Sequence, residues 1–285
     1  MFTYLLLISS FAAHAEFTLL TEGEYDGHEE EEIVTKVPWR SFLSTRDVEI
    51  SGTLRYPKLK DGAELRKFPV IVYNHGGHTK RKEGNSRTSQ ELMVSLLVRK
   101  GFAVLTPARK GFANSGVRRN TLEADVTEPI SCDASESEQG LKSAITDVSA
   151  FLAAIAKNDK LDARRIVMSG HSRGGFLSLA YAAAHPGSVM GVVSFVPGWH
   201  SETCPTSYNY IKLSEFASRI SSPTYIFYAN RDWFYNESHV KNFVQMFSSN
   251  KEVAAIVVEG GHDVPRGEIG LWESSLEAIF KGKQR

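Results

Sequence analysis

Residues 166–177 decide the fold of this chain, and they read Ile166-Val-Met-Ser-Gly-His-Ser-Arg-Gly-Gly-Phe-Leu177. Within them, Gly170-x-Ser172-x-Gly174 has the spacing of a nucleophile elbow, a sharp turn from a strand into a helix with the serine at its apex. Glycine is suited to both flanking positions because the backbone passes close by on either side of the serine. The free N–H groups and positive dipole end of the helix favour negative charge beside the serine.

A helix is expected directly after this motif. Apolar residues recur there at helical spacing until His185-Pro186-Gly187 ends the pattern, namely Phe176, Leu177, Ala180, Tyr181 and Ala184. A G-x-S-x-G match alone is common by chance. The strand-like run before it and the helical pattern after it make this match informative.

Length and composition indicate one soluble α/β domain, which we place over residues 46–285. The chain has 285 residues, of which 42% are hydrophobic and 23% charged, and its formal net charge is zero. A core of ordinary size is therefore available. The neutral balance gives no reason to expect a nucleic-acid partner.

Short apolar runs alternate with helical patterns along the rest of the chain. Strands are expected at residues 68–73, 102–106, 165–169, 189–196, 224–229 and 253–258, and helices at 92–100, 141–155, 213–220, 240–247 and 269–280. An early antiparallel strand pair is expected around Val48, Ile50, Leu54 and Tyr56. Continuously apolar strands separated by helices predict a mostly parallel sheet of about eight strands, covered on both faces.

Several chemically active residues follow these strands closely. In open α/β sheets, ligands bind beyond the carboxyl ends of the strands. We therefore expect one edge of the sheet to gather His75, Arg109, Ser172, Trp199, Asp232 and His262.

Three of these residues have the chemistry of a catalytic triad. Ser172 needs a base to take its proton, His262 in a Gly-Gly-His-Asp turn is the expected base, and Asp232 is the expected carboxylate that orients it. Alternatively, Asp232 caps the helix that follows it. Asp263 and Glu237 are rival acids, although Asp263 adjoins His262 and would struggle to reach its ring.

The other histidines have plainer expected roles. His171 is expected to pack beside the nucleophile or to contact substrate, and His185 to end a helix. Three more are expected at the surface: His28, His200 and His239. No set of residues has convincing metal-ligand spacing, so we predict neither a metal nor another cofactor.

Two backbone N–H groups are expected to form an oxyanion hole. One is the amide of Arg173, directly after the nucleophile. The other is the amide of Gly77 or His78, in the His75-Gly76-Gly77-His78 loop that follows a strand. The alternative for that loop is an ordinary glycine turn.

Together these residues resemble the α/β-hydrolase superfamily over roughly residues 45–282. Gly170-His-Ser172-Arg-Gly174-Gly175, the His75-Gly76-Gly77 loop and the chain order Ser172, Asp232, His262 carry the resemblance. The chain is most similar to dienelactone hydrolase-like and prolyl-oligopeptidase-like members. Their R-G-x-G-x-S-x-G loop is similar to residues 109–116, where Lys110 displaces the first glycine. Dienelactone hydrolases proper use a cysteine nucleophile, so Ser172 argues against their specific activity.

The resemblance and the triad predict a serine esterase that acts on small or medium acyl esters. An exopeptidase or amidase with the same triad is the alternative, and a non-catalytic binding protein is a third reading. We expect loops 112–138 and 198–212 to shape the pocket, with candidate walls at His75, Arg109, Trp199, Tyr208, Tyr210, Trp233 and Phe234. The basic residues Arg109, Lys110, Arg118 and Arg119 are interpreted as solvated charge rather than as a carboxylate site. The expected partner is a small ester or a short peptide-like substrate.

The N-terminus has features of an export signal. Residues 1–15 are apolar and end in Ala13-His14-Ala15, which indicates a cleaved signal peptide and a secreted or periplasmic protein; without cleavage, the protein is cytoplasmic. This stretch is too short for stable membrane insertion. Residues 16–45 are interpreted as an acidic lead-in. Cys132 and Cys204 form a disulfide in an exported protein or remain free thiols.

Overall fold

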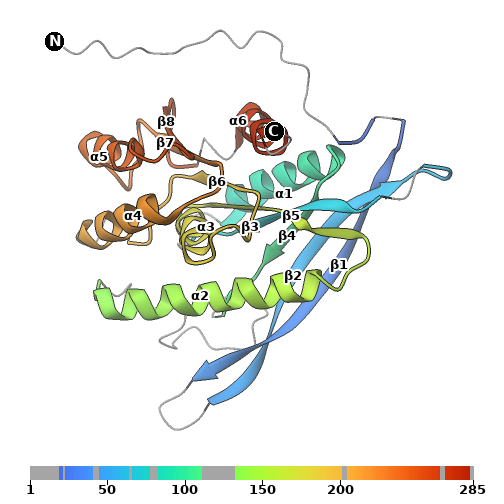
Figure 1. Ribbon diagram of the computed structural model, residues 1–285, viewed down its shortest axis with the longest axis horizontal. Coiled ribbons are helices and arrows are strands. Elements are labelled where there is room, and N and C mark those ends of the chain that lie inside the picture. The colour runs from blue at the N-terminus through green and yellow to red at the C-terminus, as the bar shows by residue number, and fades with distance from the viewer. Residues whose placement is uncertain are drawn as a thin grey trace.

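One eight-stranded sheet with helices on both faces forms the centre of the computed structural model (Figure 1). The structure describes residues 19–21, 23–40, 45–63, 66–77, 83–110, 132–200, 204–263 and 267–282, with only the backbone for residues 40 and 83–89. The strands are β1 (Tyr25–Arg40), β2 (Thr45–Leu59), β3 (Phe68–Asn74), β4 (Ala103–Pro107), β5 (Leu161–His171), β6 (Gly191–Phe195), β7 (Thr224–Ala229) and β8 (Val253–Val258).

The sheet order is β1-β2-β4-β3-β5-β6-β7-β8. Strands β3 to β8 run parallel, whereas β1 and β2 are antiparallel to their neighbours. Every residue of β3 and β6 is buried, as expected for parallel strands covered on both faces. The predicted fold class, a mostly parallel sheet of about eight strands, is therefore confirmed.

The described part of the chain has six helices, which divide between the two faces of the sheet: α1 (Glu83–Arg99), α2 (Ala134–Ile155), α3 (Arg173–Ala184), α4 (Ser207–Arg219), α5 (Glu237–Phe247) and α6 (Ile269–Gly282). Buried side chains of α2 to α5 share one hydrophobic core, and those of α1 and α6 share another. Trp272 of α6 is fully buried in the second core. Within the described ranges, none of these helices has the length and apolarity to span a membrane.

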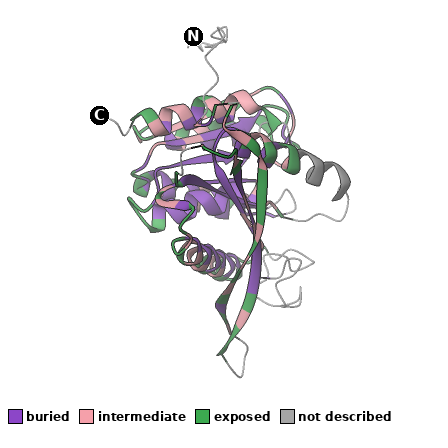
Figure 2. Ribbon diagram, turned by 90° about the vertical axis from the view of Figure 1, so that its right-hand side faces the viewer, coloured by how far each residue is buried: buried purple, intermediate pink, exposed green. Residues whose placement is uncertain are grey.

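The segment 25–40 is a strand rather than a lead-in. It pairs with β2 in a long antiparallel ribbon that projects beyond the helices, and many of its residues are exposed (Figures 1 and 2). The sheet therefore begins at Tyr25, not near residue 46. The early strand pair is likewise β1 with β2, since β2 continues through Tyr56 and Pro57 as one strand. Residues 1–15 lie outside the described part of the chain.

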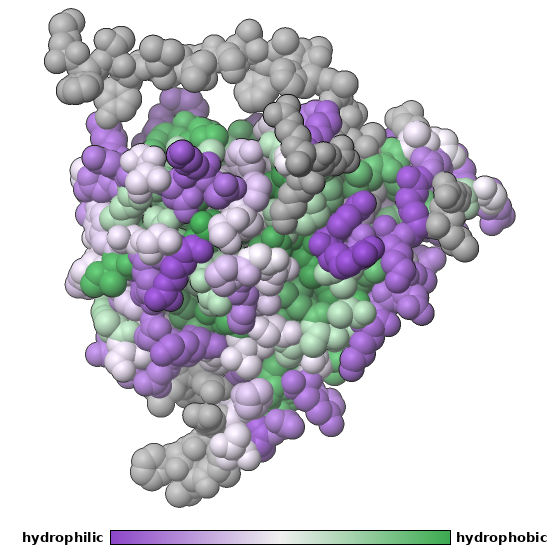
Figure 3. Space-filling view, viewed as in Figure 1, coloured by the Kyte–Doolittle hydropathy of each residue, from purple (hydrophilic) through white to green (hydrophobic). Residues whose placement is uncertain are grey.

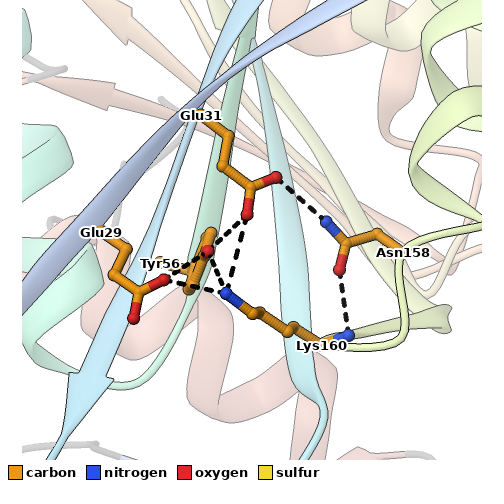
Figure 4. Close-up of polar contacts among 5 residues, drawn as sticks. All are labelled: Glu29, Glu31, Tyr56, Asn158 and Lys160. Atoms are coloured by element: carbon orange, nitrogen blue, oxygen red, sulfur yellow. Dashed lines mark hydrogen bonds and ion pairs between the residues drawn. The ribbon is translucent and has the colours of Figure 1, made fainter.

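A polar cluster attaches this ribbon to the rest of the sheet (Figure 4). The Tyr56 hydroxyl lies 2.6 Å from Glu29 Oε2 and also contacts Glu31. Lys160, in the turn before β5, donates to Glu29 Oε2 at 2.8 Å and contacts Tyr56. The acidic run thus has partners on β2 and near β5, which explains why so charged a stretch forms a strand.

Candidate active site

Ser172 occupies the sharp turn between β5 and α3. Its backbone has φ 55° and ψ −121°, a strained conformation for a residue with a side chain. Its N–H donates to the Phe195 carbonyl of β6 at 2.8 Å. A Cβ on Gly174 would lie 1.9 Å from the Asn74 carbonyl oxygen, and one on Gly170 would lie 2.4 Å from Gly174. Only glycine fits these two positions, as the motif requires.

Asp232 and His262 form a buried pair at the ends of β7 and β8. His262 Nδ1 lies 2.9 Å from Asp232 Oδ2 and 3.0 Å from Oδ1. The side chain of His262 is 4% exposed and that of Asp232 is 0% exposed. Because the carboxylate only accepts, Nδ1 carries a proton, and in the neutral imidazole Nε2 is then the nitrogen with the lone pair. Among the described residues, this buried Nε2 has no hydrogen-bond partner.

The alternatives for the acid do not fit this geometry. The N-cap of α5 is Asn236, which accepts from the His239 amide, so Asp232 does not cap that helix. Asp232 Oδ1 instead accepts from the Phe234 amide at 2.8 Å. Glu237 pairs with Lys241 on the exposed side of α5. Asp263 lies 3.8 Å from His171 Nε2 rather than beside the Nδ1 of His262.

Three rings surround His262. Phe234 lies with its centroid 4.3 Å from the imidazole, Trp233 at 5.6 Å and His171 at 4.8 Å. His171 Nε2 also lies 2.9 Å from the His262 carbonyl oxygen and therefore donates to it. His171, the residue before Ser172, thus links the elbow to the histidine turn, in agreement with its expected packing role. Trp233 is half exposed, so this side of the site opens to solvent.

The glycine loop after β3 lies against the elbow. The Cβ position of Gly76 is 3.2 Å from the His171 carbonyl oxygen and 3.4 Å from Ser172 Cβ, and that of Gly77 is 3.3 Å from Arg173 Cδ. Arg173 begins α3, where the first amides of a helix lack partners within it. The loop and the first turn of α3 therefore adjoin Ser172. His78 lies outside the described residues.

The basic residues after β4 are buried, which corrects their interpretation as solvated charge. Arg109 and Lys110 are each 1% exposed. Arg109 Nη1 donates to the His75 carbonyl at 2.9 Å and so supports the glycine loop. Lys110 forms an ion pair with Asp147 of α2, whose pKa is raised by burial against the opposing effect of Lys110. Sequence spacing does not reveal Asp147 as a partner. Arg118 and Arg119 lie outside the described residues.

Trp199 and His200 are also buried, so His200 is not the surface residue that was expected. Each is 3% exposed. The Trp199 carbonyl accepts from Arg173 Nε at 2.8 Å, and the Arg173 guanidinium lies 5.4 Å from the Trp199 ring. Asn209 Oδ1 accepts from the amides of Trp199 and His200 at 2.9 and 3.0 Å. Through these contacts, the loop holds the Arg173 side chain in place.

The remaining predictions give a mixed result. His28 and His185 are exposed and His239 is half-buried. Tyr208 packs in the core against Phe176 and His200, whereas Tyr210 is half-buried. Asn209 and Ser137, which contacts His200 Nε2 at 2.6 Å, were not singled out because no motif marks them. Of the two alternatives for Cys132 and Cys204, the structure has the disulfide, which joins the start of α2 to the loop before α4.

Comparison with known proteins supports the fold assignment. A family model described as alpha/beta hydrolase fold matches residues 69–206. No curated protein matches the sequence. An esterase of Pyrococcus furiosus is 16% identical, with a TM-score of 0.56 over 87% of this chain and 92% of that chain.

Two further solved structures are similar. A dienelactone hydrolase-like promiscuous phosphotriesterase from metagenomic libraries is 13% identical, with a TM-score of 0.57 over 90% of this chain and 99% of that chain. A puromycin-hydrolyzing peptidase of Mycobacterium tuberculosis is 17% identical, with a TM-score of 0.56 over 85% of this chain but only 38% of that chain. The matched family model, these likenesses and the sheet order show that the chain has the alpha/beta hydrolase fold.

Proposed function

We propose that this protein is a serine hydrolase, with Ser172 as nucleophile, His262 as general base and Asp232 as the group that orients His262. The observation that carries the proposal is the buried Asp232–His262 pair, whose Nε2 has no partner among the described residues. The His262 ring packs against His171, which directly precedes Ser172 at its strained turn. A histidine with one nitrogen fixed and the other available is suited to proton transfer.

The proposed reaction is acyl transfer in two steps. Ser172 Oγ attacks the substrate carbonyl carbon while its proton moves to His262 Nε2. The oxyanion accepts hydrogen bonds from the Arg173 amide and from an amide of the glycine loop, Gly77 or His78. When the carbon–oxygen bond of the ester breaks, His262 returns the proton to the departing alcohol. Water then attacks the acyl-enzyme by the same proton path and releases the acid and free Ser172.

For the substrate we propose a small or medium acyl ester. Trp233 and Phe234 provide apolar surface beside His262, and half of Trp233 is open to solvent. Such a surface suits a short acyl or aryl group better than a long lipid chain. The esterase and peptidase among the similar structures support the carbonyl substrate class. An amide substrate is the second candidate.

Labelling with a fluorophosphonate probe tests the nucleophile. We expect one adduct on the peptide that contains Ser172, lost in Ser172→Ala and strongly reduced in His262→Ala, with Asp263→Asn as the matched control that labels normally. Absence of an adduct on folded wild-type protein would contradict an activated serine. Nitrophenyl esters of increasing acyl length and aminoacyl nitroanilides then separate esterase from amidase activity.

We also propose that the protein is exported to an oxidising compartment. Disulfides persist mainly outside the cytosol, and Cys132 pairs with Cys204. Expression in a secreting host tests this proposal. We expect the secreted protein to have the intact mass of a chain that begins at Glu16. A protein that stays inside the cell and keeps Met1 would contradict the proposed export.

A further inference from the structure

Arg173, the residue directly after Ser172, is buried beside the proposed active site. Hydrophilic residues cover much of the molecular surface seen in Figure 3, whereas Arg173 is only 9% exposed. Arginine is rarely buried to this extent unless its guanidinium has specific partners. The hydrolase function proposed above uses only the backbone amide of Arg173, so it does not explain why the side chain is buried here.

The glycine loop lies against the aliphatic part of this side chain. A Cβ on Gly77 would lie 3.3 Å from Arg173 Cδ and 3.7 Å from Nε, so little space separates the arginine from the Gly77 backbone. The same loop is held from another side by Arg109, which donates to the His75 carbonyl. The Arg173 side chain therefore contacts the loop at a residue that is a candidate for the second oxyanion donor.

The loop between β6 and α4 fixes the direction of the Arg173 side chain. Arg173 Nε donates to the Trp199 carbonyl at 2.8 Å, and the guanidinium carbon lies 5.4 Å from the centroid of the Trp199 ring, where a cation is attracted to the aromatic face. The Trp199 amide donates to Asn209 of α4. The Gly198 amide donates to the Ser172 carbonyl at 3.4 Å, so this loop is also tied to the elbow itself.

This supporting loop is rigid. The carbonyl of His200 accepts from Tyr235 Oη at 2.8 Å and from Asn209 Nδ2 at 3.1 Å. A Cβ on Gly198 would lie 1.6 Å from the Tyr235 hydroxyl, which leaves room for glycine alone. Val196 has φ 44°, a strained conformation for a β-branched residue that persists only where its surroundings fix it.

We propose that the side chain of Arg173 is a positioning residue for the oxyanion hole. The hole needs two amides aimed at one oxygen, that of Arg173 on α3 and that of Gly77 or His78 in the glycine loop. Anchored on Trp199, the arginine stem sets the distance between these two elements. The proposal rests on the proposed hydrolase function, and it assigns the side chain no contact with the substrate. Misplacement of such a group by about 1 Å costs on the order of 10²-fold in rate.

Steady-state kinetics of the full chain on a nitrophenyl ester test this role. Arg173→Met keeps an apolar stem but loses the Nε donor and the charge. We expect kcat to fall about 10- to 100-fold, because the oxyanion forms only in the transition state. KM should stay within about twofold of wild type, since a misplaced hole does not weaken ground-state binding.

Two more variants provide the comparison. Arg173→Lys keeps a positively charged donor, but its Nζ lies farther along the stem than Nε, so we expect an intermediate rate, about 3- to 10-fold below wild type. Arg165→Met is the matched control, because it removes a guanidinium that lies 5.5 Å from the Phe280 ring in the first half of β5. This control should keep the wild-type kcat.

Inhibition by an aryl trifluoromethyl ketone gives a second readout. Ser172 Oγ adds to the carbonyl carbon of the ketone, the carbonyl electron pair moves to the oxygen that becomes the oxyanion, and the serine proton passes to His262. In each folded Arg173 variant, we expect the inhibition constant to rise by the factor by which kcat/KM falls. The matching alcohol cannot form this adduct and should bind equally well to all variants.

The outcomes separate this role from the hydrolase function itself. A wild type that neither hydrolyses the ester nor reacts with a fluorophosphonate would overturn the hydrolase function, and the role of Arg173 with it. With an active wild type, equal kcat in Arg173→Met and Arg165→Met, or a change confined to KM, would overturn only the role of Arg173. Should Arg173→Met not fold, a wild-type rate in Arg173→Lys would do the same.

Discussion

At the scale of single residues, the environments of Asp232 and Asp263 distinguish two neighbouring carboxylates. Asp232 is buried against His262 Nδ1, whereas Asp263 is about half exposed beside His171. We expect Asp232→Asn to lower kcat on a nitrophenyl ester by roughly 10³- to 10⁴-fold, because the amide no longer holds the useful tautomer or stabilises the imidazolium. Asp263→Asn should remain near the wild-type rate. Equal losses in both variants, measured at saturating substrate, would contradict the assignment of Asp232.

His171 offers a second prediction at this scale. Its Nε2 donates to the His262 carbonyl, so it positions the turn that carries the base. We expect His171→Phe to keep the ring packing but lose this bond, with kcat falling about fivefold because one hydrogen bond is worth about 1 kcal/mol. KM should change little, since the ring itself does not bind the acyl group. A change confined to KM would instead indicate substrate contact.

The same residues show what the sequence reveals and what it does not. Ser172, Asp232 and His262 follow strands whose apolar runs are visible locally, so their shared edge was predictable. The sequence did not predict the burial of four residues, namely Arg109, Lys110, Trp199 and His200. Each is buried by partners far along the chain, such as Asp147 for Lys110 and Asn209 for the Trp199 loop. Long-range pairs of this kind leave no periodic signal.

At the scale of elements, the loop between β6 and α4 is held by a buried histidine and a disulfide. Burial lowers the pKa of His200 below its ordinary 6.5. His200 therefore binds a proton more readily in the unfolded chain than in the folded protein. As the pH falls below about 6.5, this proton uptake lowers the free energy of unfolding. We expect unfolding in urea to show a pH dependence of at most about 1.4 kcal/mol per pH unit from this group. His200→Asn should flatten the slope; an unchanged slope would contradict the assignment.

The disulfide acts on the same loop through the unfolded chain. Cys132 and Cys204 are separated by 72 residues, and closing a loop of that length stabilises by about 4 kcal/mol in the chain-entropy model. We expect Cys132→Ser, Cys204→Ser and the double variant to lose similar free energies of unfolding in urea. Reductant should lower the stability of the wild type alone. A single variant far less stable than the double one would point to lost packing instead.

Strand β1 shows why one element escaped prediction. Its run Glu29 to Glu32 is typical of a solvated segment, yet residues 28–40 of β1 pair with β2 without a break. Among the residues of β1 whose side chains the structure describes, only Val37 is fully buried, so the strand carries few strongly apolar inward positions. The strand is specified by partners on β2 and by Lys160, which become neighbours only after folding. The parallel strands carry their own apolar signal and were correctly predicted.

At the scale of the whole molecule, two buried cores form the scaffold and one edge of the sheet carries the proposed chemistry. Two tryptophans separate these roles. Trp272 is fully buried between Tyr73 and Phe195, whereas Trp233 is half exposed beside His262. We expect Trp272→Ala to lower the free energy of unfolding by about 3–5 kcal/mol, because it opens a large cavity. The remaining folded protein should keep its KM.

Trp233→Ala should raise KM and leave the free energy of unfolding nearly unchanged. Little buried surface is lost, so stability should change by about 0.5 kcal/mol or less. KM for esters with aryl or branched acyl groups should rise several-fold, since the apolar contact beside His262 is removed. Urea unfolding and steady-state kinetics on the same two variants measure both quantities. The result would be contradictory if Trp233→Ala were the less stable variant or if Trp272→Ala alone raised KM. In that case the buried core would not be separate from the edge that carries the proposed chemistry.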